Sequence, residues 1–149
     1  MKSVVKVVIL LISFNPGTFA QTVDGSWTFS AVGTSDYSLT TVSSTDLFGG
    51  NLPAGDPTIN LVVGRTYRIT VQNSFVHPLQ IIAKSSSFNN DQVLLAQGFT
   101  TGSLEQDAGI AWNDNGSGVV TFTLTQPLFN AMQANGRIPG YRCGVHPST

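Results

Sequence analysis

The sequence predicts an all-β protein built as a β-sandwich, with one short helix. Several runs of residues alternate between apolar and polar side chains, which is the period of a half-buried strand. The chain also has 15 Gly and 7 Pro among its 149 residues, and these interrupt it often enough for short strands and turns. Apolar residues make up 41% of the chain, so we expect one domain with a substantial core, and a disordered chain is excluded.

The N-terminal residues 1–20 have the pattern of a secretory signal peptide. Lys2 and Lys6 flank the start of an apolar run at residues 4–12, and small residues precede Gln21, where cleavage is expected. The run is too short to span a bilayer, and no later apolar stretch is long enough for a transmembrane helix. We therefore expect residues 21–149 to form one domain of a secreted protein, or a periplasmic one if the host is bacterial. A buried N-terminal strand is the alternative interpretation of the same run.

The strands are predicted from runs rich in β-branched and aromatic residues. Most of these runs alternate, and the one at residues 92–97 is the weakest. Gly64 and Arg65 separate two runs as in a tight hairpin, and several short strands with such turns favour an antiparallel sandwich. In chain order the predicted strands are residues 26–31, 59–63, 67–72, 78–83, 92–97 and 120–124.

The helix is predicted over residues 127–135. Pro127 suits the first turn, where a missing N–H costs nothing, and Gly136 marks the end. Leu128 and Met132 share one face of this helix. Met132 is therefore expected to pack in the core.

The charge of the chain argues against nucleic-acid binding. Only 10% of the residues are charged, the formal net charge is −1, and the basic residues are scattered singly. No basic surface is therefore expected to hold phosphate groups. The sequence shows no small-molecule substrate site and does not identify a redox partner.

The residues able to carry chemistry are one Cys and two His. Cys143 and His146 form a Cys-x-x-His motif, and His77 lies at the head of a predicted strand. A lone thiol in an oxidising compartment tends to oxidise or pair unless it is protected, and metal ligation would protect it. Tyr141 and Cys143 are two residues apart, so they face the same side of a strand. One thiolate and two imidazoles form the ligand set of a blue copper site.

An isolated His followed much later by Tyr-x-Cys-x-x-His-Pro resembles the cupredoxin family, of the plastocyanin and azurin type. The resemblance covers residues 51–149, including the strand-turn-strand pattern before the first His. It implies a Greek-key β-sandwich and one type 1 copper ion held by His77, Cys143 and His146. It also implies single-electron transfer rather than enzymatic catalysis, with electrons entering and leaving through His146.

The chain departs from the family pattern after the second His. The family has an axial Met a few residues later and then a final strand, whereas this sequence ends at Thr149 and its only Met residues are Met1 and Met132. The chain is C-terminally incomplete, or the site has three ligands, or the site does not bind copper. We expect the first, because a sandwich without its last strand has an unpaired edge.

Other interpretations use the same residues. Zinc binds Cys and His, although a closed structural zinc site has a fourth ligand. A copper enzyme needs further His clusters, and a serine hydrolase needs a nucleophile elbow, which this sequence lacks. The alternative function is an extracellular β-sandwich interaction module that binds no copper. Separately, Asn115 begins a sequon for N-glycosylation within a loop that also suits a plain turn.

Overall fold

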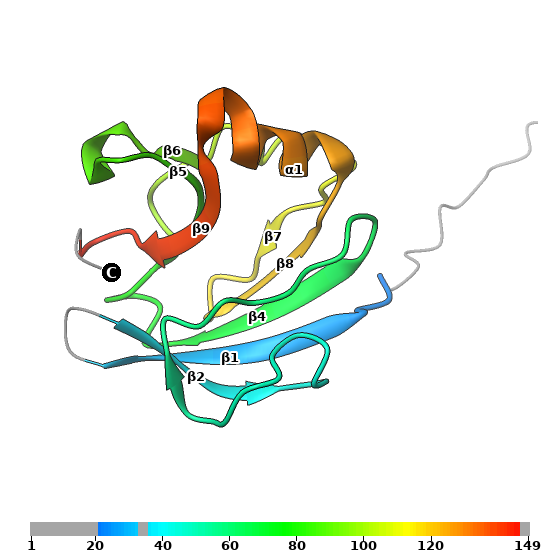
Figure 1. Ribbon diagram of the computed structural model, residues 1–149, viewed down its shortest axis with the longest axis vertical. Coiled ribbons are helices and arrows are strands. Elements are labelled where there is room, and N and C mark those ends of the chain that lie inside the picture. The colour runs from blue at the N-terminus through cyan, green and yellow to red at the C-terminus, as the bar shows by residue number, and fades with distance from the viewer. Residues whose placement is uncertain (1–20, 33–35, 147–149) are drawn as a thin grey trace, which may run out of the picture.

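The computed structural model describes residues 21–32 and 36–146, and these form two packed β-sheets with one short helix (Figure 1). One sheet has the strand order β3-β2-β1-β4-β8-β7 and the other has the order β6-β5-β9. The two sheets confirm the predicted all-β class. The strands are β1 (Gly25–Val32), β2 (Asp36–Val42), β3 (Ala54–Gly55), β4 (Thr66–Gln72), β5 (Leu79–Lys84), β6 (Gln92–Ala96), β7 (Asn113–Asp114), β8 (Val119–Thr123) and β9 (Ile138–Cys143).

The predicted signal peptide at residues 1–20 lies outside the described residues and stays a prediction. Within the described ranges, no helix has the length and apolar character needed to cross a membrane.

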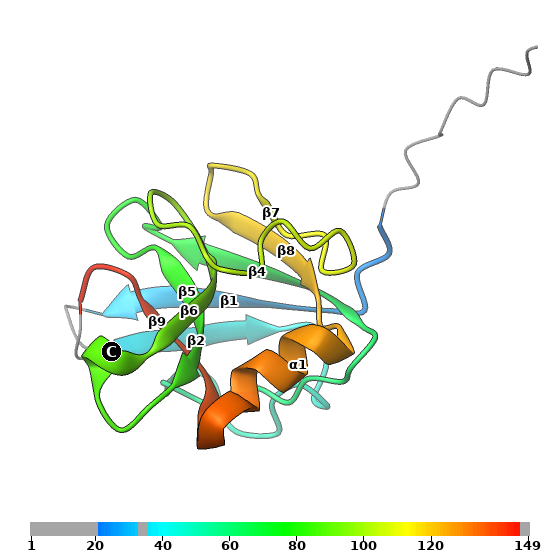
Figure 2. The ribbon, with the colours of Figure 1, turned by 90° about the horizontal axis from the view of Figure 1, so that it is seen from above.

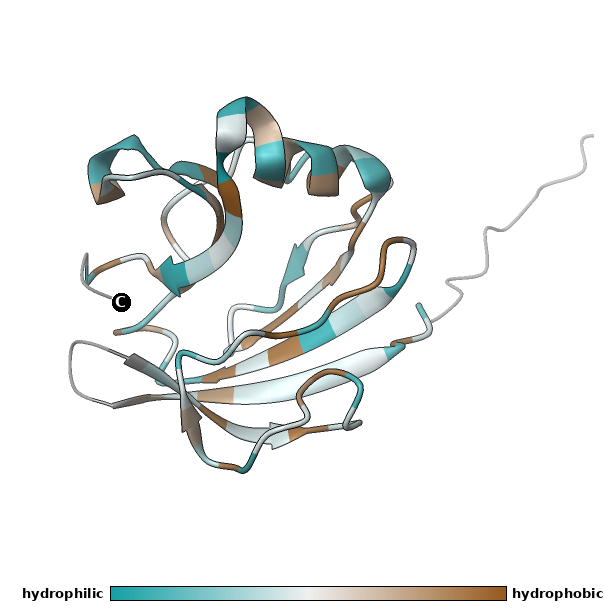
Figure 3. Ribbon diagram, in the orientation of Figure 1, coloured by the Kyte–Doolittle hydropathy of each residue, from teal (hydrophilic) through white to brown (hydrophobic). Residues whose placement is uncertain are grey.

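The alternating pattern places one face of each strand in the core. In β4, Tyr67 and Ile69 are buried while Arg68 between them is exposed. Figure 3 shows the resulting change of hydropathy along this strand. Each buried apolar side chain of this size contributes about 1.5–3 kcal/mol to folding, so the pattern determines which face turns inward.

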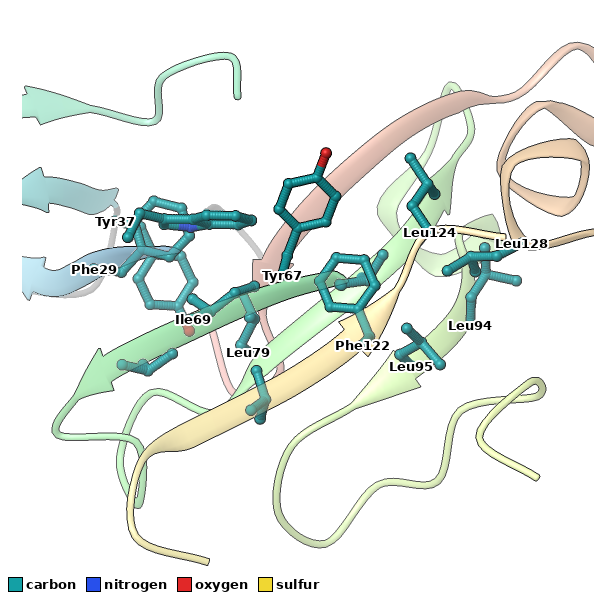
Figure 4. Close-up of a cluster of buried hydrophobic side chains, with 14 of the residues drawn as sticks. Phe29, Tyr37, Tyr67, Ile69, Leu79, Leu94, Leu95, Phe122, Leu124 and Leu128 are labelled. Atoms are coloured by element: carbon teal, nitrogen blue, oxygen red, sulfur yellow. The ribbon is translucent and has the colours of Figure 1, made fainter. Parts of the chain in front are cut away.

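The core lies between the two sheets. Tyr67, Ile69 and Phe122 come from the six-stranded sheet, and Leu79 and Leu94 come from the three-stranded sheet, as Figure 4 shows. All five side chains are at most 2% exposed, so the two sheets are held together by continuous apolar contact.

The predicted strand at residues 59–63 is wrong. This segment is irregular, and Gly64 lies in a turn that leads directly into β4. The predicted hairpin needs a free edge of β4, but β4 pairs with β1 on one side and β8 on the other. Ile59 and Leu61 still pack against the core, which explains the alternating pattern without a strand.

The expectation of purely antiparallel pairing is also wrong at one place. β1 and β4 run parallel, with Gly25 opposite Tyr67, while the other strand pairs are antiparallel. A parallel pair needs a long connection, and β2 and β3 supply it as further strands of the same sheet. The prediction did not include β2, β3 or β7.

The α-helix of the described residues, α1 (Gln126–Gln133), lies close to its predicted place. The Thr125 hydroxyl accepts a hydrogen bond from the Leu128 N–H at 3.2 Å, which caps the first turn. Leu128 and Met132 are buried as predicted, and the helix packs on β5, β6 and β9 (Figure 2). The chain then passes through a short 3-10 turn, η2 (Ala134–Gly136), in which Asn135 has a left-handed φ of 59°. A second 3-10 turn, η1 (Phe88–Asn90), lies between β5 and β6.

A groove opens between the sheets along β9. It has a volume of about 670 Å³ and is lined by Trp27, Phe129, Tyr141 and the segment at residues 56–61, among others. Among the described residues β9 pairs only with β5, so its other edge has no neighbouring strand. The described part of β9 is therefore an edge strand that borders this groove.

Candidate metal centre

His77 lies in the connection that crosses from β4 to β5. The chain turns at Asn73, whose carbonyl accepts hydrogen bonds from the N–H groups of Val76 and His77, both at 2.9 Å. Asn73 has a left-handed φ of 58°, a conformation that Asn tolerates better than most residues. Pro78 follows, and β5 begins at Leu79, so His77 stands directly before the strand.

Cys143 is the last residue of β9 and is 1% exposed. β9 runs antiparallel to β5 and places Cys143 opposite Leu79, two residues after His77. The Gly144 N–H then donates to the Pro78 carbonyl at 2.7 Å, which extends the pairing by one step. The two ligand-bearing segments are therefore joined by backbone hydrogen bonds.

The three predicted ligands come together. The Cys143 Sγ lies 3.8 Å from the His77 Nδ1 and 3.5 Å from the His146 Nδ1. The two imidazole rings are 4.8 Å apart between centroids and inclined by 38°. One ligand atom from each residue can be chosen so that all three lie within 4.8 Å of one another. Among the His, Cys, Asp and Glu side chains of the described ranges, these three form the group whose ligand atoms lie close enough to hold a metal ion.

These separations fit a metal ion. Metal–sulfur and metal–imidazole bonds of roughly 2.3 and 2.0 Å, opened at tetrahedral to trigonal angles, separate sulfur from nitrogen by roughly 3.5–3.7 Å. The Sγ–Nδ1 distance of 3.5 Å to His146 lies within this range, and the distance of 3.8 Å to His77 lies just above it. Sulfur and imidazole ligands suit copper in both of its common oxidation states. The donor set therefore fits the ion that the sequence predicted.

The sulfur also receives a backbone hydrogen bond. The Val145 N–H points to the Cys143 Sγ at 3.5 Å. Such bonds around a ligating sulfur tune the reduction potential of the metal that it holds. The tight turn after Cys143 thus places the Val145 N–H on the sulfur and also returns His146 toward it.

Sequence reasoning missed Tyr37, which lies against this site. Its hydroxyl donates to the His77 carbonyl at 2.7 Å, and its ring stacks on Phe29 at 5.1 Å. Burial raises the pKa of Tyr37, and its closeness to Cys143 raises it further. The phenol therefore stays protonated and remains a donor. The alternation of Tyr37 and Leu39 could have revealed a strand, but no sequence signal joins Tyr37 to His77.

Burial also changes the pKa of the His77 imidazole. Desolvation lowers the pKa of His77, and the nearby His146 lowers it further. The ring is therefore neutral at neutral pH, which is the form that binds a metal.

Arg142 lies between Tyr141 and Cys143 on the opposite face of β9, away from the core, and it is nevertheless buried. Its guanidinium forms an ion pair with Asp91 at 3.0 Å and donates from Nε to the Gln80 Oε1 at 2.9 Å. It also lies 3.9 Å above the ring of Phe88. The residue next to Cys143 is thus fixed on the outer side of the three-stranded sheet.

Apolar side chains flank the candidate ligands on the surface. Phe75 and Val145, near His77 and His146 respectively, are 84% and 57% exposed. Both His residues are themselves only half-buried, whereas the sulfur is covered. The imidazoles are therefore the part of the site closest to solvent.

Met132 lies in the core, on α1, rather than in the ligand group. The described residues thus bring together three candidate ligands, the ones that the sequence predicts. Comparisons with protein-family models, curated proteins and solved structures found no match to this chain.

Proposed function

We propose that this protein carries single electrons through one type 1 copper ion bound by His77, Cys143 and His146. The observation that carries the proposal is the convergence of one sulfur and two Nδ1 atoms, with Sγ–Nδ1 distances of 3.8 and 3.5 Å. One thiolate and two imidazoles in a trigonal arrangement is the ligand set of blue copper electron-transfer sites. The bound copper would supply the one-electron couple.

The surrounding chain supports a carrier because it holds the ligands stiffly. His77 and Cys143 stand at the ends of paired strands, and the Tyr37 hydroxyl and the Val145 N–H fix atoms around them. A site that keeps its geometry in both oxidation states needs little rearrangement when an electron moves. His146 is the proposed point of exchange, since it is less buried than the sulfur and lies beside exposed Val145.

The fold supports membership of the cupredoxin family, which remains part of the proposal. The resemblance implies a Greek-key β-sandwich, and the sequence places His77 at the head of one strand and Cys143 at the end of another. Here His77 precedes β5, and Cys143 ends β9, which is paired with β5. Secretion likewise rests on the predicted signal peptide and on the lone Cys, for which a copper ion would provide protection.

Zinc is the competing ion for the same residues. Closed structural zinc sites have four protein ligands, and the described group offers three. Copper is also bound more tightly than zinc by a given set of such ligands. The donor set therefore favours copper.

Voltammetry of the copper-loaded protein tests the electron-carrier proposal. We expect one reversible one-electron couple that disappears in Cys143→Ser. Met132→Leu is the matched control, because it removes the other sulfur of the described chain from a buried position while conserving volume. It should leave the couple unchanged. A protein that binds no copper, or binds it without a reversible couple, contradicts the proposal.

The second candidate is the interaction module, and the groove along β9 favours it. The Gly144 N–H donates to the Pro78 carbonyl across the β5–β9 pair. In an antiparallel pair the residues alternate between bonding to the partner strand and facing away from it, so the backbone N–H and C=O of Tyr141 face the open edge of β9. Trp27 lines the groove, is 5% exposed, and its indole N–H has no hydrogen-bond partner among the described residues. An extended strand with alternating apolar side chains would supply carbonyl acceptors to both places.

A peptide titration separates the two functions. The probe is a peptide of about six residues in which Val and Thr alternate, and the amide signals of Tyr141 and the indole signal of Trp27 are followed by NMR. Saturable shifts, together with His77→Ala and Cys143→Ala variants of unchanged metal content and thermal stability, would establish the module. Loss of copper in those variants without a peptide response supports the electron carrier.

A further inference from the structure

Arg142 occupies an unusual position for a charged side chain. It lies one residue before the candidate ligand Cys143 and is 8% exposed, although it is on the face of β9 away from the core. A buried guanidinium costs free energy unless it is paired and fully hydrogen-bonded. The contacts of Arg142 therefore matter for the segments that they hold in place.

The contacts of Arg142 join two distant parts of the chain. The guanidinium Nη1 donates to the Asp91 carboxylate at 3.0 Å and to the Phe88 carbonyl at 3.1 Å. The other oxygen of Asp91 accepts the Ser85 N–H at 2.7 Å. One oxygen of Asp91 therefore ties the loop between β5 and β6 to β9, while the other oxygen holds that loop to itself.

The third contact of Arg142 leads toward the metal-binding turn. Arg142 and Gln80 are cross-strand partners, and the Nε–Oε1 hydrogen bond of 2.9 Å fixes the orientation of the Gln80 amide. The other amide atom, Nε2, lies 2.9 Å from the position that a Cβ would take on Gly144. The Gln80 amide thus covers Gly144, the residue between Cys143 and the segment that brings back His146.

We propose that the Asp91–Arg142–Gln80 chain is a positioning device that fixes the turn from Cys143 to His146 and so the geometry of the ligand group. This inference rests on the proposed function in one respect, namely that the residues positioned by the turn are copper ligands. The β5–β9 ladder fixes the backbone as far as Gly144, whose N–H bonds to Pro78. Val145 and His146 lie beyond that ladder, so the Gln80 amide is the outer support of the turn.

Outer contacts of this kind hold ligands in the orientation that a metal needs, and their loss typically weakens metal affinity by about 10- to 100-fold. Neither Arg142 nor Gln80 is itself a candidate ligand, so both would affect metal binding through the conformation of the turn. A Cβ on Gly144 would press on the Gln80 amide, which would then have to shift.

The test compares Arg142→Met with Leu47→Ala in the copper-loaded full chain. Leu47 is 5% exposed and packs near Gly25, at the end of the large sheet remote from His77, so its loss lowers stability without touching the turn. We expect Arg142→Met to release copper about 10- to 100-fold faster and to change the copper electron paramagnetic resonance spectrum. Leu47→Ala should change neither. Equal release rates and spectra in the two variants overturn the proposal.

Hydrogen exchange of the Gly144 amide in the metal-free chain provides a readout independent of copper. We expect lost protection in Arg142→Met but not in Leu47→Ala, and equal protection in both contradicts the positioning role. Gln80→Leu, which keeps the volume and removes the amide, gives the same comparison if Arg142→Met does not fold. If the wild-type chain binds no copper, the proposed function fails while this exchange measurement still decides the role of Arg142.

Discussion

The Tyr37 hydroxyl connects the β-sheet core to the candidate metal centre. It donates to the His77 carbonyl at 2.7 Å from a buried ring. Tyr37→Phe removes the hydroxyl donor, so the His77 carbonyl loses this hydrogen bond. We therefore expect the free energy of unfolding to fall by about 1–3 kcal/mol. We also expect weaker copper binding, because the backbone of a ligand is released. Urea unfolding and copper titration measure the two effects.

Tyr141→Phe is the matched control for this prediction. Its hydroxyl is also a donor to a backbone carbonyl at 2.7 Å, but that carbonyl belongs to Pro57, away from the ligands. Burial raises the pKa of both tyrosines, so both are protonated donors. The control should lose stability and keep its copper affinity. Equal copper affinity in both variants would show that the Tyr37 contact does not support the site.

At the level of single residues, the sequence was sufficient to identify the three candidate ligands that the fold brings together, and insufficient for their surroundings. His77, Cys143 and His146 could be found because the chain offers so few residues that bind soft metals. The contacts of Tyr37 and Arg142 depend on register between strands that are far apart in sequence. No local pattern specifies such pairs.

At the scale of elements, the start of β8 depends on a glycine. Gly118 has a left-handed φ of 90°, and a Cβ there would lie 2.7 Å from the Val71 carbonyl oxygen. Gly118→Ala should therefore cost more than the roughly 1–2 kcal/mol expected from the left-handed backbone alone. Thermal or urea unfolding measures this cost.

Gly116→Ala isolates the backbone contribution to that cost. Gly116 also has a left-handed φ, of 68°, but a Cβ there would meet nothing within 4 Å. The difference in unfolding free energy between the two variants then reports the steric contact with β4. Variants of equal stability would show that the close approach of Gly118 to Val71 is relieved at no cost.

Element prediction succeeded where a pattern and its pairing partner agreed. The alternation in β1, β4 and β8 is that of real strands, and α1 follows its proline and its cap. The segment at residues 59–63 alternates equally well, but β1 and β8 occupy both edges of β4. Occupied edges are a property of the whole sheet, which explains why the local pattern was misleading there.

At the scale of the whole molecule, copper binding should be coupled to folding. An ion that binds only the folded chain stabilises it by about 2.7 kcal/mol when its free concentration is 100 times its dissociation constant. We expect copper to raise the melting temperature of the wild-type chain and to leave that of Cys143→Ser unchanged. Calorimetry with and without copper checks this, and equal shifts in both proteins would place the binding elsewhere.

The open edge of β9 is the other whole-molecule feature. The groove beside it contains the buried indole N–H of Trp27, which has no partner in the described part of the chain. The proposed interaction module would bind an extended strand at this edge.

The most direct measurement for the central claim is the visible absorption spectrum of the chain after addition of Cu(II). A sulfur anion bound to Cu(II) beside two imidazoles gives an intense blue colour. The account predicts this band in the wild-type protein, with one equivalent of copper, and its loss in Cys143→Ser. A wild-type protein that stays colourless with copper present would contradict it.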